Sequence, residues 1–459
     1  MVTRRVLLLA TTTGYQTRTF GEAAERLGVE LVFATDRCHV IDDPWRDAAI
    51  PIRFYDEDAA VEAILAVAVD RPIDGVVAVG DRPTLIAARV ASALGLPWHS
   101  AEGAAVARNK LRTRERLRDA GLPVPWFSSI ELDGQGRGLT PSVAVESYPC
   151  VVKPLSLSGS RGVMRADDPA SLAAAVTRLH ALMRSPDIRA ERNDAHETAL
   201  VEGFIPGREY AVEALLHHGA IHPLAIFDKP DPLDGPFFEE TIYVTPPDLG
   251  ADAQAAILDA VARAAAAVGL GHGPIHAECR VNASTRREPE GRPERGLWAT
   301  GSGPTEVFVL EVAARPIGGL CARALRFGKT FDGDTSRSAT EATSCPLEEV
   351  LLRHALGECP ATWRREGCAA GVMMIPIPRR GVLRGVAGVE AACDVPCVDE
   401  VRITAKADQV LVPLPEGASY LGFIFARADR ACDVERALRQ AHARLRFTIE
   451  AEFPVRASV

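Results

Sequence analysis

The first hundred residues alternate between short hydrophobic runs and longer amphipathic segments. The hydrophobic runs have the length and the Val, Leu and Ala content of buried strands, and they cover 6–10, 30–34 and 75–79. The amphipathic segments have helical spacing, and they cover 17–27, 59–69 and 84–94, with Gly95 as a stop signal. Repeated strand–helix units favour an open parallel sheet, so we predict an N-terminal βα domain over residues 1–105.

The turn that follows the first of these strands, at 11–15, lacks the G-x-G-x-x-G spacing of a dinucleotide site. Asp36 closes the second strand, but without the glycines it gives little support for such a site. We therefore interpret this domain as a scaffold or as a substrate-side domain.

Residues 106–345 show a different mixture of patterns. Helices are predicted at 109–120, 169–183 and 252–268, and strands at 198–204, 209–216, 274–282 and 306–313, besides a strand that ends at Lys153. The proline-rich residues 228–245 and the charged residues 284–305 are expected to form loops, the second of them a long exposed hairpin loop. We predict one domain here.

From residue 346 the pattern changes to short strands, predicted at 371–375, 409–413 and 421–426, and to a final helix from Cys432. This part is predicted to be a small α+β domain over residues 346–459. The fold class expected for the whole chain is thus α/β and α+β in three parts.

Composition excludes several classes of function. The net charge of -9 argues against a general affinity for nucleic acid or anionic membranes. The apolar run near the N-terminus is too short for a signal peptide core, and no stretch has the length of a membrane span. We expect a cytoplasmic protein with reduced thiols, because the ten cysteines are scattered and only Cys393 and Cys397 are closely spaced, without a matching pair for zinc. Only five of the 52 basic residues are lysines, so each surviving lysine is a better candidate for a required amine.

The residues around position 315 carry the clearest chemical signal. A hydrophobic run leads to Glu311, and four residues later comes Arg315, followed by Gly318 and Gly319. A carboxylate can hold a divalent metal, an arginine can neutralise phosphate oxygens, and glycines allow a substrate to approach the backbone.

Two earlier segments have features of phosphate and nucleotide sites. Lys153 ends a strand and precedes a turn of small residues at 156–163, whose N–H groups can wrap phosphate oxygens, although it is not a Walker loop. Residues 202–209 join two strands, and their backbone could meet an adenine edge while Glu209 takes ribose hydroxyls. Further on, His276 and Glu278 share a strand face, and Glu278 converges with Glu311 if their strands are neighbours.

The order of these motifs, beginning with Asn109-Lys110, resembles the ATP-grasp superfamily over roughly residues 1–345. The resemblance implies ATP and Mg²⁺ or Mn²⁺ as cofactors, and it implies a mobile lid over about residues 121–200. It implies Glu278 and Glu311 as metal ligands and Arg315 as the residue that stabilises the transferring phosphoryl group. The residues that it implies for ATP binding are Lys110, Lys153, Ser158, Gly159, Ser160, Gly162, Glu202, Phe204, Ile205 and Glu209. One departure is Ala313, where many members have an asparagine that also binds metal.

A narrower resemblance is to the L-amino acid ligases, which are carboxylate–amine ligases that make dipeptides. Residues 228–246, with Glu240, look like their substrate-side loop, and residues 412–426 look like part of their C-terminal domain. On the substrate side this implies Glu240, Arg315, Gly318 and Gly319. The implied partners are ATP, a small carboxylate and a small amine, and a homodimer is a fair default.

The function expected from this resemblance is ATP-dependent phosphorylation of a carboxylate, with an amino acid as the expected acid, followed by attack of an amine on the acyl phosphate. His276 and Glu240 are the two candidates for the base that deprotonates the amine. Two alternatives stay open: activation of a different acid, such as bicarbonate or a biosynthetic intermediate, and a non-catalytic ATP-binding sensor. Ala313 favours the sensor, whereas Glu278, Glu311 and Arg315 oppose it.

Overall fold

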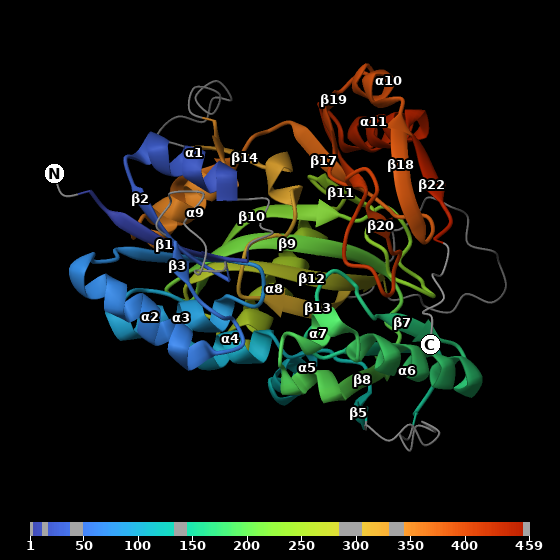
Figure 1. Cartoon of the computed structure of the whole chain (residues 1–459), viewed down its shortest axis with the longest axis horizontal. Coiled ribbons are helices and arrows are strands. Elements are labelled where there is room, and N and C mark those ends of the chain that lie inside the picture. The colour runs from blue at the N-terminus through green and yellow to red at the C-terminus, as the bar shows by residue number, and fades with distance from the viewer. Residues whose placement is uncertain are drawn as a thin grey trace, which may run out of the picture.

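The N-terminal part is a small parallel sheet covered by helices on both faces (Figure 1). The structure is a computed structural model that describes residues 3–11, 17–36, 49–132, 145–283, 305–329 and 344–452. The strands pair in the order β3-β2-β1-β4, all parallel. The elements are β1 (Arg5–Ala10), α1 (Thr17–Leu27), β2 (Glu30–Thr35), β3 (Ile50–Pro51), α2 (Glu57–Asp70), β4 (Gly75–Val79), α3 (Thr84–Leu94) and α4 (Ala101–Ala107). The predicted open βα sheet is confirmed; of the turn at 11–15, only Thr11 lies within the described residues.

The next part contains a four-stranded antiparallel sheet in the order β5-β8-β6-β7. Its helix α6 packs on β6 through Leu172, Val176 and Leu179, which form their own hydrophobic core. Asn109 caps the preceding helix α5 by accepting from two backbone N–H groups. The elements are α5 (Lys110–Asp119), β5 (Phe127–Glu131), β6 (Cys150–Pro154), β7 (Met164–Ala166), α6 (Pro169–Met183), α7 (Pro186–Arg189), the 3-10 helix η1 (Asp194–Glu197) and β8 (Thr198–Gly203).

An eight-stranded antiparallel sheet forms the centre of the molecule (Figure 1). Its order is β13-β12-β9-β10-β11-β17-β21-β19, and α8 covers β12 and β13 through Ile257, Val261 and Ala264. These strands and the helix are β9 (Arg208–His217), β10 (Ala220–Asp228), β11 (Ile242–Thr245), α8 (Ala251–Val268), β12 (Gly273–Ala283) and β13 (Thr305–Ala313). β11 corrects the loop expected over 228–245, because its edge pairs with β17, a strand more than a hundred residues later. The loop expected at 284–305 lies almost wholly outside the described residues.

The C-terminal part supplies β17, β21 and β19 to the central sheet and covers two of them with α11. Two further three-stranded sheets have the orders β15-β14-β16 and β20-β18-β22. The elements are η2 (Cys321–Ala324), β14 (Arg326–Lys329), β15 (Cys345–Pro346), α9 (Leu347–Ala355), η5 (Pro360–Thr362), β16 (Trp363–Arg365), β17 (Ala369–Ile375), β18 (Gly381–Ala387), α10 (Val389–Cys393), β19 (Val398–Ile403), β20 (Val410–Leu411), β21 (Gly422–Ala428), α11 (Ala431–Arg444) and β22 (Arg446–Glu450). Because the central sheet runs across residue 345, the domain limit placed there stays a prediction.

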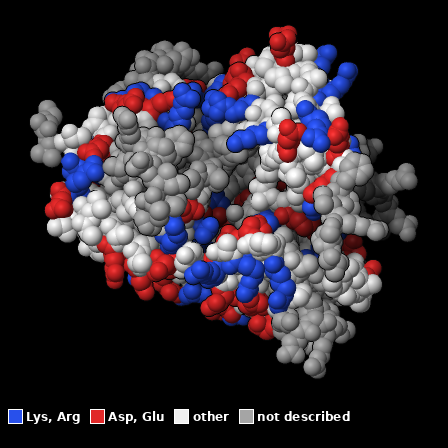
Figure 2. Space-filling model, in the orientation of Figure 1, with Lys and Arg blue, Asp and Glu red and all other residues white. Residues whose placement is uncertain are grey.

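The three parts surround a common centre. In Figure 1 the N-terminal sheet, the β5–β8 layer with α6 and the C-terminal elements lie on different sides of the central sheet. Figure 2 shows a hollow near the middle of the same face, with acidic and basic side chains at its edge. Within the described ranges, no helix has the length and apolar character needed to cross a membrane.

Candidate active site

A cavity of about 560 Å³ lies where the N-terminal sheet, the β5-β8-β6-β7 sheet and the central sheet meet. The C-terminal part also lines it, through residues such as Thr404 and Tyr420. The cavity contains every site residue predicted from the sequence except Gly162, namely Lys110, Lys153, Ser158, Gly159, Ser160, Glu202, Phe204, Ile205, Glu209, Glu240, His276, Glu278, Glu311, Arg315, Gly318 and Gly319. Segments that are distant in the sequence therefore share one site, although the role of each residue stays a prediction.

The two glutamates proposed as metal ligands lie on neighbouring strands, as the sequence suggested. Glu278 on β12 is the register partner of Glu311 on β13. Their carboxylates have different partners, because Glu278 lies 2.9 Å from the Nζ of Lys229 and Glu311 lies 3.5 Å from the Nζ of Lys110. Each carboxylate therefore faces an ammonium group. Ala313, at the position where an asparagine was expected, is buried opposite His276.

Lys229 is surrounded by three carboxylates. Its Nζ lies 2.7 Å from both Glu209 and Glu240, besides its contact with Glu278. The three carboxylates have oxygen atoms within 4.8 Å of one another. Burial alone would lower the pKa of Lys229, but the three carboxylates raise it well above its usual value. Burial and the neighbouring Glu278 raise the pKa of Glu240 to about 7. The cluster thus concentrates acidic oxygens around one cation at the wall of the cavity.

His276 lies between two carboxylates. Its Nδ1 is 3.2 Å from Glu213 and its Nε2 is 3.7 Å from Glu278. Burial would lower the pKa of His276, but these two carboxylates raise it to about 9. At that pKa the ring carries both protons near neutral pH. The role of His276 or of Glu240 as the base stays a prediction.

Arg315 is held by a residue of the N-terminal sheet. Its Nε and Nη2 donate to the two carboxylate oxygens of Asp81 at 2.8 and 3.0 Å. Burial would lower the pKa of Arg315, but Asp81 raises it, so the guanidinium stays charged. Glu213, fully buried, accepts from the N–H of Ile317 at 3.0 and 3.1 Å and so fixes the backbone just after Arg315. The arginine is therefore oriented from both sides.

The two lysines expected to bind phosphate are anchored differently. The Nζ of Lys110 donates to the carbonyl of Leu157 at 2.7 Å, at the start of the small-residue loop. Lys153 pairs with Glu202, which also accepts from the Nε of Arg114 at 2.7 Å. Burial would raise the pKa of Glu202, but Arg114 and Lys153 lower it to about 2. The side chain of Glu202 thus fixes the position of Lys153.

The loop at 156–163 is attached to the C-terminal part. Gly159 has φ of 63° and so takes a left-handed conformation that few other residues tolerate. Gly162 does not line the cavity, and its N–H donates to the carbonyl of Pro415 at 2.8 Å, so its expected role in ATP binding stays a prediction. Gly162 has φ of 77°, and a Cβ there would lie 3.0 Å from Leu179 of α6, so the position favours glycine. Glu416 pairs with Arg178 of α6 at 2.9 Å and joins that helix to the same segment.

One part of the cavity lining is an apolar cluster. Phe204 and Phe238 stack with ring centroids 6.4 Å apart, and Val151, Val163 and Leu233 complete this small cluster. Two of the backbone groups expected to meet adenine already have partners. The N–H of Phe204 donates to the carbonyl of Pro149, and the carbonyl of Ile205 accepts from Arg280 at 2.7 Å. Both oxygens of Glu209 are likewise engaged, by Lys229 and Arg280, so its contact with ribose stays a prediction.

Sequence reasoning missed Asp81, Lys229 and Glu213. Lys229 had a usable signal, because it is one of only five lysines in an arginine-rich chain and lies beside the proline-rich loop. Asp81 follows β4 directly, at the carboxyl end of a parallel strand, where ligand sites of open α/β sheets occur. Glu213 had no local signal, since it lies within a hydrophobic strand.

Three family models match successive parts of the chain. The ATP-grasp N-terminal domain matches residues 21–98, the ATP-grasp domain matches 146–295, and the L-amino acid ligase C-terminal domain 2 matches 373–450. The L-amino acid ligase from Bacillus licheniformis has a similar solved structure, with 27% identity, a TM-score of 0.72, and 97% of this chain and 99% of that chain covered.

Two curated relatives agree with these matches. The D-alanine–D-alanine ligase of Gloeobacter violaceus is 32% identical over 268 residues, which is 57% of this chain and 72% of the relative. The ATP-grasp enzyme fsqD of Aspergillus fumigatus is 28% identical, and the match covers 65% of this chain but only 53% of that relative's length. The chain therefore belongs to the ATP-grasp family, in the group of ligases that join a carboxylate to an amine. These relatives do not favour the bicarbonate or the sensor alternative.

Enzymes of the ATP-grasp family bind ATP, and members have been solved with ADP and magnesium. Carboxylate oxygens are the ligands that Mg²⁺ prefers, and the acidic groups of this cavity offer several of them. Lys229 already satisfies part of this negative charge, which leaves Glu311 and one side of Glu278 facing the cavity.

Proposed function

We propose that this protein uses ATP to phosphorylate the carboxylate of an amino acid and then joins that acid to an amine, with release of ADP and phosphate. The observation that supports the proposal best is that Lys110, Lys153 and Arg315 line the same cavity as Glu278 and Glu311. Phosphoryl transfer requires little covalent help from a protein, but it requires alignment and neutralisation of the phosphate charge. These residues supply both.

Each end of the cavity suits a different part of the reaction. The apolar cluster with Phe204 and Phe238 would contact the adenine ring. Lys110, Lys153 and the loop at 156–163 would lie along the phosphates. Glu278 and Glu311 would hold the divalent ion, which neutralises the phosphate oxygens when it is bound. Arg315, held by Asp81, would face the oxygens of the transferred phosphoryl group.

The proposed reaction has two steps. A carboxylate oxygen attacks the γ-phosphorus, the bond to the ADP oxygen breaks, and an acyl phosphate forms. A neutral amine next attacks the acyl carbon, phosphate leaves with the bonding electrons, and a base removes one proton from the nitrogen. Water must be excluded while the acyl phosphate exists, and the loop joined to Pro415 and Glu416 would provide that cover.

The lining near Glu240 suggests the class of acid. Gly319 lies against Phe423, since a Cβ at Gly319 would be 3.7 Å from that ring. Cys321 and Met374 are in sulfur–sulfur contact at 3.7 Å, and the Tyr420 ring meets Phe423 edge-on. These side chains form an apolar wall beside Arg315 and the glycines. We infer that the acid is an amino acid with an apolar side chain, whose carboxylate would lie near Arg315.

The test is phosphate release by the purified protein with Mg-ATP across pairwise mixtures of the twenty amino acids. The expected result is release that requires particular pairs, with an apolar residue as one member, and an amide product that mass spectrometry detects. Glu311→Ala is the control, and it should lose release because a metal-binding carboxylate is missing. ATP binding with no release for any pair would contradict this substrate class.

A non-catalytic ATP-binding role is the second candidate, and the specific observation for it is Ala313, which offers no side-chain ligand opposite His276. Ala313→Asn distinguishes the two. If the protein is a ligase that tolerates the alanine, the variant should change the metal requirement of an activity that the wild type already has. If the wild type releases no phosphate and only the variant does, the sensor role is correct.

A further inference from the structure

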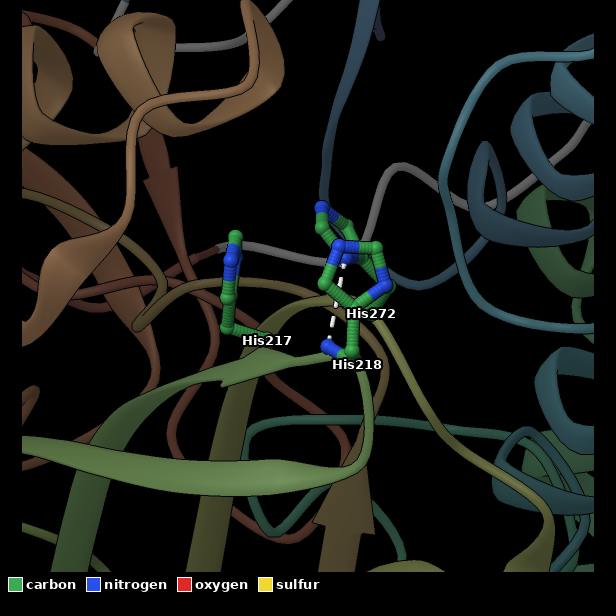
Figure 3. Close-up of side chains that lie close together, drawn as sticks. All are labelled: His217, His218 and His272. Carbon is green, nitrogen blue, oxygen red and sulfur yellow. Dashed lines mark hydrogen bonds between the residues drawn. The ribbon is translucent and has the colours of Figure 1, made fainter.

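Five of the eleven histidines gather at a place away from the active-site cavity. His217 is the last residue of β9, and His218 lies in the turn that leads to β10. His272 lies just before β12, and His354 lies in α9. His222 on β10 is more peripheral, with its ring centroid 6.1 Å from that of His217. Figure 3 shows the imidazoles of His217, His218 and His272 close together above this turn.

The nitrogen positions suit a shared cation. One ring nitrogen of each of His217, His218 and His272 lies within 4.8 Å of the others. The Nδ1 of His217 lies 3.2 Å from the Nε2 of His354. Two imidazole nitrogens bound to one tetrahedral Zn²⁺ at ~2.0–2.1 Å would be separated by roughly 3.3 Å. The His217–His354 pair therefore already has the spacing of two ligands of one ion.

The hydrogen bonding of His272 is incomplete in the part of the chain that the structure describes. Its ring is buried and stacked on His354 with centroids 4.4 Å apart. Its Nδ1 accepts from the N–H of His218 at 3.4 Å, a long hydrogen bond that Figure 3 draws as a dashed line. Its Nε2 is buried without a hydrogen-bond partner among the described residues. A buried polar atom in this state needs an explanation, and a bound ion is one.

Two features of the histidine cluster bear on metal binding: its access to solvent and the type of its ligand atoms. His218 is exposed and His217 is half-buried, so solvent reaches one side of the cluster. Imidazole nitrogens without a carboxylate favour Zn²⁺, Co²⁺, Ni²⁺ or Cu²⁺ over Mg²⁺ and Ca²⁺. Arg364 is the charged group that acts on His222, which makes His222 the least suitable ligand of the five.

We propose that His217, His218, His272 and His354 form a binding site for one divalent transition-metal ion, with Zn²⁺ as the first choice. The site would join three separate elements: the β9–β10 turn, the segment before β12, and α9. Helix α9 also packs against β4, where a Cβ at Gly75 would lie 2.6 Å from the carbonyl of Ala355. An ion here would therefore link the central sheet to α9, the helix that packs against the N-terminal sheet, and its role would be structural.

The test uses untagged full-length protein stripped of metal with EDTA. Zn²⁺ binding is measured by calorimetry with excess Mg-ADP present, so that the active site is occupied, and Co²⁺ binding is followed by visible absorption. The variant is His217→Asn with His218→Asn, because His218 has φ of 51° and asparagine tolerates that conformation. His442→Asn on α11 is the matched control.

The expected result is one Zn²⁺ per wild-type chain, the intense visible bands of tetrahedral Co²⁺, and a fall in affinity of about 10²-fold or more in the double variant. Zn²⁺ should also raise the melting temperature of the wild type and of His442→Asn, but not that of the double variant. Should the double variant fail to fold, His218→Asn alone at the exposed position gives the same comparison. Equal Zn²⁺ affinity in wild type and variant, or no binding by the wild type, would overturn the proposal.

Discussion

Arg315 and Asp81 are 234 residues apart in the sequence, yet the guanidinium donates two parallel hydrogen bonds to the carboxylate, at 2.8 and 3.0 Å. This pair connects the end of β4 in the N-terminal sheet to the segment after β13. A planar guanidinium held at both Nε and Nη2 has little freedom to rotate, so the remaining donor edge keeps one direction. The N-terminal sheet is thereby more than a scaffold, because it orients a residue of the candidate active site.

Replacement of Asp81 by Asn should lower kcat for phosphate release by about 10- to 100-fold, because a small displacement of a positioned group has effects of that size. KM for ATP should change much less, since Asp81 holds Arg315 and is not expected to contact the nucleotide. Steady-state kinetics of phosphate release measure both constants. Asp58→Asn is the matched control, because Asp58 pairs with Arg89 at the surface of the same sheet domain. An unchanged kcat in Asp81→Asn would show that the pair does not orient Arg315 for the reaction.

The stability contributed by Glu202 should depend on pH in the acid range. The pKa of its carboxyl in the folded protein is about 2, because burial is outweighed by Arg114 and Lys153, whereas it would be about 4.5 in the unfolded chain. This stability is fully present above pH 4.5 and is lost as the pH falls from there toward 2. The total amounts to about 3 kcal/mol, from about 1.4 kcal/mol for each pKa unit.

Urea unfolding of wild type and Glu202→Gln across this pH range provides the measurement. The variant should be less stable at pH 7 by about 3–5 kcal/mol, because it leaves two buried cations without their carboxylate. The difference between the two proteins should narrow below pH 4.5, where the Glu202 carboxyl gains its proton in the unfolded wild-type chain but not yet in the folded protein. If the difference in the free energy of unfolding stays constant down to the lowest pH at which both proteins fold, Glu202 does not contribute this pH-dependent stability.

Lys229→Met should destabilise the protein by about 3–5 kcal/mol, because Glu209, Glu240 and Glu278 would lose the cation that they share. Added Mn²⁺ or Mg²⁺ should recover part of this loss, since a divalent ion can take the place of the ammonium group among the oxygens. Denaturation midpoints with and without the ion measure both effects. The exposed Lys406→Met is the control, and equal midpoints for the two variants would contradict the prediction.

The contact between Arg178 and Glu416 should hold the lid closed only weakly, because an exposed ion pair contributes at most about 1 kcal/mol. Glu416→Gln should therefore increase ATP hydrolysis that yields no amide by up to about fivefold, since a lid that opens more often admits water to the acyl phosphate. The ratio of phosphate to amide product measures this loss of coupling. Glu197→Gln removes a similar exposed pair, with Arg189, elsewhere in the lid and should leave the ratio unchanged. The charge-swapped protein, with Arg178→Glu and Glu416→Arg, should recover the coupling. If Glu416→Gln does not lower the coupling and the charge swap does not restore it, this contact does not hold the lid closed.

Met374→Ala should shift substrate preference toward acids with larger apolar side chains, because it removes volume from the apolar wall beside Cys321. A change of about tenfold in the ratio of kcat/KM between a large and a small acid is expected for a difference of this size. Met373→Ala is a close control, since Met373 is also buried on β17 but packs into the C-terminal core instead. If the two variants show the same preference, Met374 does not contact the acid.

Local sequence patterns determined the elements whose signals are strong and short-range. Periodicity and capping signals depend on neighbouring residues, so the limits of several elements were predicted correctly. These elements are the helices Thr17–Leu27, Thr84–Leu94 and Pro169–Met183 and the strand Gly75–Val79. Glu278 and Glu311 were expected to converge if their strands were neighbours, and the two residues are register partners on β12 and β13. The β11 strand was missed because its partner β17 lies far along the chain and its own residues follow several prolines.

The sequence by itself therefore determined the family, most of the elements and part of the residues that line the cavity, because motif order and periodicity are properties of the chain. Only the tertiary structure decided what each group experiences. Glu213 from β9 gives His276 a raised pKa, and Asp81 from the first sheet fixes Arg315. Lys229 likewise becomes the centre of three carboxylates only when β9, β12 and the segment before β11 converge. Electrostatic surroundings arise from distances between remote residues, and those distances exist only in the folded chain.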